Sequence, residues 1–358
     1  MRVAGELMTE NSSRGPGLLE RLEEGPLVCA EGYLFELERR GYLQAGAFVP
    51  EVVIDNPEQV TSLHRDFVRA GSDVVEALTY YAHREKLRAV GKDGMLEEMN
   101  RQALALAREV ADESGTLLAG NVCNTNLYDP QNPESHGPTQ AMFEEQVGWA
   151  EEAGVDFVIG ETFRYAAEAQ IALDVIRKAG LPAVITLAVG QVADTREGDS
   201  LTDACRRLAD EGAAVVGLNC IRGPATMLPL LAAIVAAVDV PVAALPVPYR
   251  TTEEQPTFQS LREADASLLP DGRPFPTALD PFTCNRYEIA DFTVAAQAAG
   301  VRYLGLCCGA GPHHVRSMVE ALGRTPEASR YSVDMSKHAY FGTVPGLQEH
   351  NREYRDRL

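Results

Sequence analysis

Three of the seven cysteines stand where a metal site could form. Cys220 ends one apolar run (AVVGLNC), and Cys307 and Cys308 end another (RYLGLCC). If both runs are strands of one parallel barrel, their carboxyl ends lie at the same rim, so thiols distant in the chain can meet there. Adjacent residues of a regular strand point to opposite faces. Cys307 and Cys308 can therefore share one ion only where the strand ends, and Gly309 follows them directly.

Three thiols around one point favour a soft or borderline metal ion, and zinc is the first candidate. Three protein ligands leave one coordination position open, which is typical of catalytic rather than structural zinc sites. The alternative is that these thiols are packing residues, because free cysteines are common in buried strands. The other four cysteines are interpreted in that way: Cys29, Cys123, Cys205 and Cys284.

Other residues that could contact a small ligand also follow apolar runs. Glu161 ends the run VDFVIGE, where a carboxylate can pair with a ligand's ammonium group or form a salt bridge at the rim. Aromatic residues follow the early runs, namely Tyr33, Phe48, Tyr80 and Tyr81. Aromatic faces bind methylated cations, although each of these rings could equally be a packing residue.

Eight short apolar runs alternate with helical patterns and would position these residues. The runs cover residues 27–30, 73–80, 116–122, 155–161, 182–189, 214–220, 241–245 and 302–308. The helical patterns cover residues 57–70, 96–114, 140–153, 165–179, 201–211, 225–237, 286–299 and 312–322. Most runs are apolar throughout, as in parallel strands that are covered on both faces. The sequence therefore predicts an α/β fold with a single (β/α)8 barrel and a C-terminal extension. A doubly wound open sheet is the alternative, but no GxGxxG motif follows the first run.

The predicted organisation has three parts. Residues 1–16 are polar and are expected to form a flexible leader, residues 17–324 the catalytic barrel, and residues 325–358 a tail that could contact another subunit. Two long connections, 122–140 and 245–302, follow predicted strands and are expected on the catalytic face.

Composition excludes several classes of partner. Lys plus Arg is 32 and Asp plus Glu is 52, giving a net charge of −20, which argues against binding nucleic acid or anionic membranes. No apolar stretch is long enough for a membrane span, and the first residues lack the apolar core of a signal peptide. Sparse cysteines suit a reducing compartment. We therefore expect a cytoplasmic protein.

The two cysteine motifs resemble those of a known family. GLNC at 217–220 and GLCCG at 305–309 are similar to the zinc motifs of the homocysteine S-methyltransferase family. Residues 35–46, 63–74, 79–87 and 300–322 are similar to the betaine-using branch of that family. The resemblance extends from about residue 18 to about residue 325.

The resemblance implies roles for individual residues. Cys220, Cys307 and Cys308 correspond to the zinc ligands, and Glu161 to the carboxylate that holds the amino group of homocysteine. Tyr81 corresponds to an aromatic residue of the donor pocket. Tyr33 is a further substrate-binding candidate from its residue type and its place after the first run, not from the resemblance.

Three departures from the family pattern concern substrate contacts. Phe48 replaces a tryptophan of the donor pocket, and Thr162 replaces a tyrosine that follows the glutamate. The family usually has Asp-Gly-Gly at the first strand, whereas this chain has Ala30-Glu31-Gly32. Glu31 could replace the missing acid by reaching back, so Glu31 and Gly32 are also substrate-binding candidates.

The expected activity is zinc-dependent transfer of a methyl group from an onium donor to the thiol of homocysteine, giving methionine. Glycine betaine is the first candidate donor, and a sulfonium such as S-methylmethionine or dimethylsulfoniopropionate is the alternative. Two further hypotheses are a zinc-bearing homologue without activity and a barrel with structural cysteines and no zinc. The expected partners are small molecules, together with further copies of the chain in a homo-oligomer.

Overall fold

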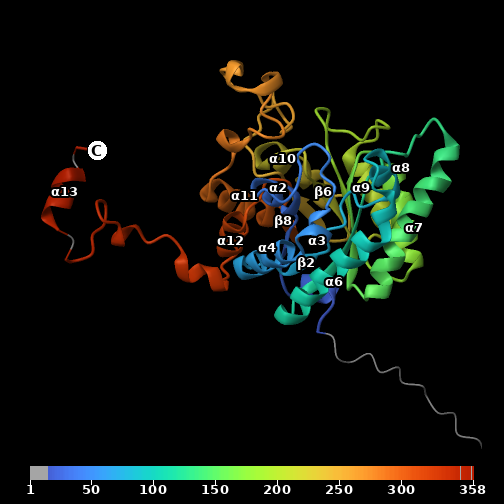
Figure 1. Ribbon diagram of the computed structural model, residues 1–358, viewed down its shortest axis with the longest axis horizontal. Helices are drawn as coiled ribbons and strands as arrows, with labels where there is room; N and C mark the ends of the chain where they lie inside the picture. The colour runs from blue at the N-terminus through green and yellow to red at the C-terminus, as the bar shows by residue number, and fades with distance from the viewer. Residues whose placement is uncertain (1–14, 347, 356) are drawn as a thin grey trace, which may run out of the picture.

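The computed structural model describes residues 15–346, 348–355 and 357–358. Eight parallel strands pair in chain order and close into a barrel, with β8 pairing with both β7 and β1. Helices surround the strands (Figure 1). The predicted (β/α)8 barrel with a C-terminal extension is confirmed. The strands are β1 Leu27–Ala30, β2 Val74–Glu76, β3 Leu117–Cys123, β4 Phe157–Phe163, β5 Ala183–Leu187, β6 Val215–Asn219, β7 Val242–Leu245 and β8 Tyr303–Leu306.

The helices predicted from the apolar pattern are all present, with ends that differ by at most four residues. They are α4 Pro57–Ala70, α6 Leu96–Ser114, α7 His136–Ala153, α8 Ala166–Lys178, α9 Leu201–Asp210, α10 Pro224–Val235, α11 Arg286–Ala298 and α12 Pro312–Ala321. Short helices that were not predicted lie between them and at the two ends: α1 Leu18–Glu24, α2 Tyr33–Arg39, α3 Val52–Asp55, α5 Arg84–Ala89 and α13 Glu349–Arg355.

The strand predicted over 73–80 is shorter than expected. It ends at Glu76 because the chain then turns, with the Thr79 amide donating to the Ala77 carbonyl at 2.8 Å. This turn leaves Tyr80 and Tyr81 on the rim rather than in the sheet.

The interior of the barrel is apolar at one end and polar at the other. Alternate strand residues such as Leu27, Val74, Phe157 and Val215 form a buried inner cluster. Leu18 and Leu22 of α1 pack into the same cluster. Because side chains alternate along a strand, the next inward positions lie at the carboxyl ends of the strands. Those positions hold Glu31, Glu76, Asn121, Glu161, Asn219 and Cys307, all buried. The apolar layers therefore support a polar layer at the catalytic rim.

After α12 the C-terminal extension first contacts the barrel helices, where Glu327 pairs with Arg69 and Ser329 donates to Glu320, and then runs away from the barrel, as the red segment of Figure 1 shows. Several of its large side chains are exposed, including Tyr331, Val333, Met335, Phe341 and Tyr354. Most of the predicted leader lies outside the described residues, and the three-part division of the chain remains a prediction. Within the described residues, none of the helices combines the length and apolar character that crossing a membrane requires.

Candidate metal centre and active site

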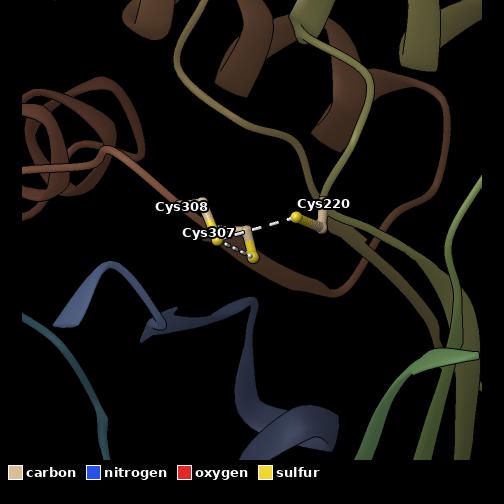
Figure 2. Close-up of side chains that lie close together, drawn as sticks. All are labelled: Cys220, Cys307 and Cys308. Atoms are coloured by element: carbon tan, nitrogen blue, oxygen red, sulfur yellow. Dashed lines mark hydrogen bonds between the residues drawn. The ribbon is translucent and has the colours of Figure 1, made fainter. Parts of the chain in front are cut away.

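The three predicted metal ligands meet at the rim of the barrel (Figure 2). Cys220 directly follows β6, and Cys307 and Cys308 directly follow β8. Strand β7 lies between β6 and β8. The Cys220 amide donates to Leu245 O at 2.8 Å and the Cys307 amide donates to Pro246 O at 3.0 Å, so the end of β7 holds the backbone of both cysteine segments. The barrel topology thus brings together thiols that are far apart in the sequence.

The sulfur positions fit a tetrahedral metal ion. The Sγ atoms of Cys220 and Cys308 are 3.7 Å apart, and those of Cys307 and Cys308 are 3.8 Å apart. Two thiolates bound to one zinc ion at about 2.3 Å and a tetrahedral angle would be about 3.8 Å apart. The three sulfurs all lie within 4.8 Å of one another. The donor set and its spacing therefore fit a metal ion bound by three thiolates.

One thiol of the cluster ionises more readily than the other two. Sulfur–sulfur hydrogen bonding to Cys307 and Cys308 lowers the pKa of Cys220 well below its usual value. The hydrogen bond with Cys220 raises the pKa values of Cys307 and Cys308, and burial adds to the rise. A cation held by the three sulfurs would compensate the charge of a thiolate at this buried position.

The turn after the cysteine pair is tightly held. Gly309 has φ of +97°, and a Cβ atom there would lie 2.2 Å from the Tyr249 hydroxyl oxygen, so only glycine fits. Arg39 donates to the Gly309 carbonyl at 2.9 Å and to the Tyr249 hydroxyl at 3.0 Å. This turn ends the strand, which allows Cys307 and Cys308 to point to one site.

Three buried carboxyl groups lie beside the cysteines around a cavity of about 20 Å³, called here the inner cavity. Glu31, Glu76 and Glu161 line it together with Asn121 and Cys307. Asn121 donates one hydrogen bond to Glu76 at 2.6 Å and another to Glu161 at 2.7 Å. None of the described residues that line this cavity is basic. An ammonium group would balance the charge of these carboxylates.

Glu161 is held by hydrogen bonds at both oxygens. Asn121 binds one oxygen, while Asn219 at 2.6 Å and the Thr162 hydroxyl at 3.1 Å bind the other. Burial nevertheless raises the pKa of Glu161 to about 7, although these hydrogen bonds favour the ionised form. Asn219 also accepts from the Thr162 amide at 2.9 Å, so it links β6 to β4 immediately before Cys220.

Glu31 differs from Glu161 because both of its carboxyl oxygens are buried without a hydrogen-bond partner. One carboxylate oxygen of Glu31, one of Glu161 and the Sγ atom of Cys307 all lie within 4.8 Å of one another. Burial, followed by the charges of Glu161 and Glu76, raises the pKa of Glu31 well above its usual value. An unpartnered buried carboxyl group is costly, and a cationic ligand would remove this cost. Glu31 thus reaches the inner cavity from one position beyond Ala30.

A second cavity of about 310 Å³, called here the outer cavity, opens on the other side of Cys308. Cys220 and Cys308 line it, and Cys308, Tyr80 and Leu34 line both cavities. Aromatic side chains form much of the wall: Phe35, Phe48, Tyr80, Tyr81, Phe258 and Phe275. The last two come from the long connection after β7, which lies on the catalytic face as predicted.

Backbone strain is concentrated at the outer cavity. Of the seven non-glycine residues with positive φ in the described chain, five line it: Phe48, Tyr81, Thr162, Cys220 and Ile221. Each such conformation costs about 1–3 kcal/mol and persists where the surrounding structure holds it, often at functional sites. The strained backbone therefore marks the same site as the cysteines.

The predicted binding residues divide between the two cavities. Phe48, Tyr81 and Thr162 line the outer one, whereas Tyr33 lines the inner one and packs against His64 with ring centroids 4.8 Å apart. Gly32 lines neither, because it lies against the backbone of Ala310, where a Cβ atom would come within 2.4 Å of the carbonyl oxygen.

One face of each predicted donor-pocket ring is already covered. Phe48 stacks on Phe35 with centroids 5.2 Å apart, and the Lys86 ammonium lies 4.5 Å from the Tyr81 ring centroid. A ligand in the outer cavity would meet the edges and remaining faces of these rings.

Sequence reasoning missed three polar residues of the site: Glu76, Asn121 and Asn219. Each is a single polar residue near the carboxyl end of an apolar strand. Counting every second residue from the inward-facing Val74, Leu117 and Val215 would have found all three.

Comparisons with known proteins agree with this geometry. A family model described as homocysteine S-methyltransferase matches residues 28–322. Betaine–homocysteine S-methyltransferase 1 of Danio rerio is 36% identical over 345 residues, which cover 94% of this chain and 82% of that protein. S-methylmethionine–homocysteine S-methyltransferase BHMT2 of Rattus norvegicus is 33% identical over 339 residues, which cover 94% of this chain and 88% of that protein.

A solved structure has the same fold. The metallated form of the Escherichia coli homocysteine methyltransferase MmuM matches with a TM-score of 0.65 and 21% identity, over 83% of this chain and 97% of that one. The family match and the relatives together confirm the resemblance drawn from the cysteine motifs. The chain belongs to the homocysteine S-methyltransferase family.

Proposed function

We propose that this protein transfers a methyl group from an onium donor to the thiol of homocysteine, giving methionine, with zinc bound by Cys220, Cys307 and Cys308. The observation that carries the proposal is that two cavities of opposite character adjoin at Cys308. The inner cavity is acidic and suits an ammonium group, and the outer cavity is aromatic and suits a methylated cation. A sulfur nucleophile between them would face both substrates.

The three cysteine thiolates would hold the metal ion. When bound, zinc would supply one open coordination position and lower the pKa of a thiol that occupies it. Residues of the chain would bind and position the two substrates. Arg39 and Tyr249 hold the turn at Gly309 and so keep the cysteine pair in place.

Glu31 and Glu161 would bind the ammonium group of homocysteine. Glu161 is fixed by Asn121 and Asn219, and Glu31 has both oxygens free of protein partners. The family's usual acid at position 30 is absent, and Glu31 takes over its role from the next position along the chain. Holding the amino group in the inner cavity orients the substrate thiol toward the outer cavity.

The chemical step is a displacement at carbon. The homocysteine sulfur, after loss of its proton, forms an S–C bond to the methyl group while the methyl bond to the onium nitrogen or sulfur breaks. The electron pair of the broken bond stays on the leaving atom, which becomes neutral. Phe48 and Tyr81 would position the onium cation. Because its charge is lost during transfer, a cage that bound the cation very tightly would slow the step.

Glycine betaine is the first candidate donor, and a sulfonium is the second. Phe48 in place of tryptophan favours the second, and one relative, BHMT2 of Rattus norvegicus, is named for S-methylmethionine. Zinc-loaded protein incubated with homocysteine and each donor in turn, with methionine measured by mass spectrometry, decides between them. Methionine from none of the onium donors would refute the proposed activity. Binding of homocysteine without turnover, seen as a rise in melting temperature, would then favour a non-catalytic homologue.

We also propose that the tail, residues 325–358, contacts a second copy of the chain. Its support is the exposure of Tyr331, Phe341 and Tyr354 on a segment that leaves the barrel. A chain that ends at residue 324 should have a smaller oligomeric mass in light scattering than the full chain. An unchanged mass would refute this role. The predicted cytoplasmic location remains a prediction.

A further inference from the structure

The outer cavity has one charged side chain in its wall, that of Arg164. Arg164 directly follows β4 and is exposed at the mouth of the cavity. Its carbonyl accepts a hydrogen bond from the Arg196 amide at 2.8 Å, which fixes the backbone of this loop. Its guanidinium forms no ion pair or hydrogen bond with any residue that the structure describes. The cavity therefore presents a guanidinium that is free to bind a ligand.

The neighbouring arginine is different and provides a contrast. Arg196 lies with its guanidinium carbon 5.5 Å from the ring centroid of Tyr165 and donates to the Tyr165 hydroxyl at 3.5 Å. Arg196 lines an adjoining cavity and not the outer one. The two arginines are close in the fold, but only Arg164 faces the space that also contains Cys220 and Cys308.

Arg164 acts electrostatically on the aromatic wall. Burial raises the pKa of Tyr81, and the positive charge of Arg164 opposes that rise. The guanidinium is thus within electrostatic reach of a ring that lines the same cavity. A ligand between Tyr81 and Arg164 would contact both an aromatic surface and a cation.

The charges around the two cavities orient a zwitterion in one direction. The carboxyl groups of Glu31, Glu76 and Glu161 line the inner cavity, whereas the exposed Arg164 lines the outer cavity, and Cys308 lines both. A donor must place its methylated cation next to the sulfur nucleophile, so its other end faces the mouth. A carboxylate at that end would be attracted by Arg164 and repelled by the acidic inner cavity.

We propose that Arg164 binds the carboxylate of the methyl donor, so that the enzyme selects onium compounds bearing a carboxylate over onium cations without one. This inference rests on the proposed function and extends it to the specificity of the outer cavity. A guanidinium binds a carboxylate through two parallel hydrogen bonds, a geometry that a lysine ammonium does not reproduce. Arg164 is therefore a specificity-determining residue.

The test compares donors with and without a carboxylate. In Arg164→Gln, the KM for glycine betaine and for dimethylsulfoniopropionate should rise about tenfold or more, because a hydrogen bond to a charged group is lost. Turnover of trimethylsulfonium, which has no carboxylate, and the KM for homocysteine should stay unchanged. Arg164→Lys should recover part of the loss, and the control Arg196→Gln should behave as the wild type.

Equal losses with both classes of donor, or no loss with either, would overturn the role of Arg164. A second readout separates this role from the proposed function. Glycine betaine is titrated calorimetrically into zinc-loaded protein that contains methionine, so that no turnover occurs. Binding that is lost in Arg164→Gln supports the role of Arg164 even if the wild type makes no methionine. Absence of binding to the wild type contradicts it.

Discussion

Asn219 donates a hydrogen bond of 2.6 Å to the carboxylate of Glu161, and Cys220 is the next residue in the chain. One buried amide thus connects the predicted metal ligand with the predicted amino-group anchor. The same side chain accepts from the Thr162 amide at 2.9 Å, so it fixes the strained residue that follows the glutamate.

Removing this amide should disturb substrate binding as well as stability. In Asn219→Ala, the Thr162 amide and one Glu161 oxygen lose a partner inside the protein, which we expect to lower the free energy of unfolding by about 1–3 kcal/mol. The KM for homocysteine should rise, because Glu161 is no longer fixed. Asn100→Ala is the matched control, since Asn100 is also buried and bonded to Ala82 O at 2.7 Å but lies outside both cavities. If both variants gave the same KM, Asn219 would have only a structural role.

The three rim cysteines should each be required for metal. We expect Cys220→Ala, Cys307→Ala and Cys308→Ala to lose most of their zinc in elemental analysis after dialysis, because two thiolates hold the ion much less tightly than three. Cys205→Ala is the control, because Cys205 is a buried free thiol that is not part of the cluster. Full zinc content in all three rim variants would refute the site.

Replacing Glu31 should weaken homocysteine binding without loss of stability. Its buried oxygens have no partner, so Glu31→Gln should leave the free energy of unfolding equal or higher, while the KM for homocysteine rises. Glu168→Gln gives the opposite pattern, because Glu168 accepts from the Thr125 amide at 2.8 Å and from its hydroxyl at 2.6 Å and lines neither cavity. Urea unfolding and steady-state kinetics measure the two effects. An unchanged KM for homocysteine in Glu31→Gln would show that Glu31 does not replace the acid that is missing at position 30.

Stability of the metal-free protein should depend on pH through Glu161. The pKa of Glu161 in the folded protein is about 7, above the ordinary value of 4.5, so the folded state holds a proton that the unfolded state has released. Its stabilising contribution is complete below about pH 4.5 and is lost as the pH rises through about 7. The free energy of unfolding should fall over this interval, and fall less in Glu161→Gln. Urea titrations across the interval check this, and identical slopes in the two proteins would contradict it.

The sequence predicts most of the fold because parallel barrel strands are buried on both faces and are therefore apolar throughout. The cysteine positions follow from the same argument, since strand ends share one rim. The short helices α2, α3 and α5 carry no comparable signal, because four to seven residues are too few to show a helical period.

The parts of the site that could not be predicted depend on three-dimensional placement. Phe258 and Phe275 come from a connection without any periodic pattern, so nothing in the sequence places them in a wall. Glu31 is predicted as a substrate contact from its place next to Ala30, but its two buried, unpartnered oxygens depend on side-chain packing that the sequence does not show. Arg164 looks like an ordinary surface residue until the cavity beside it is known.

We propose that three thiolates hold a zinc ion and leave one position for the substrate thiol. X-ray absorption at the zinc edge counts the sulfur neighbours of the ion directly. We expect three sulfur ligands at about 2.3 Å in the zinc-loaded protein and four after homocysteine is added. A sulfur count that does not change on addition of homocysteine, or a count of four from the protein alone, would contradict this zinc site.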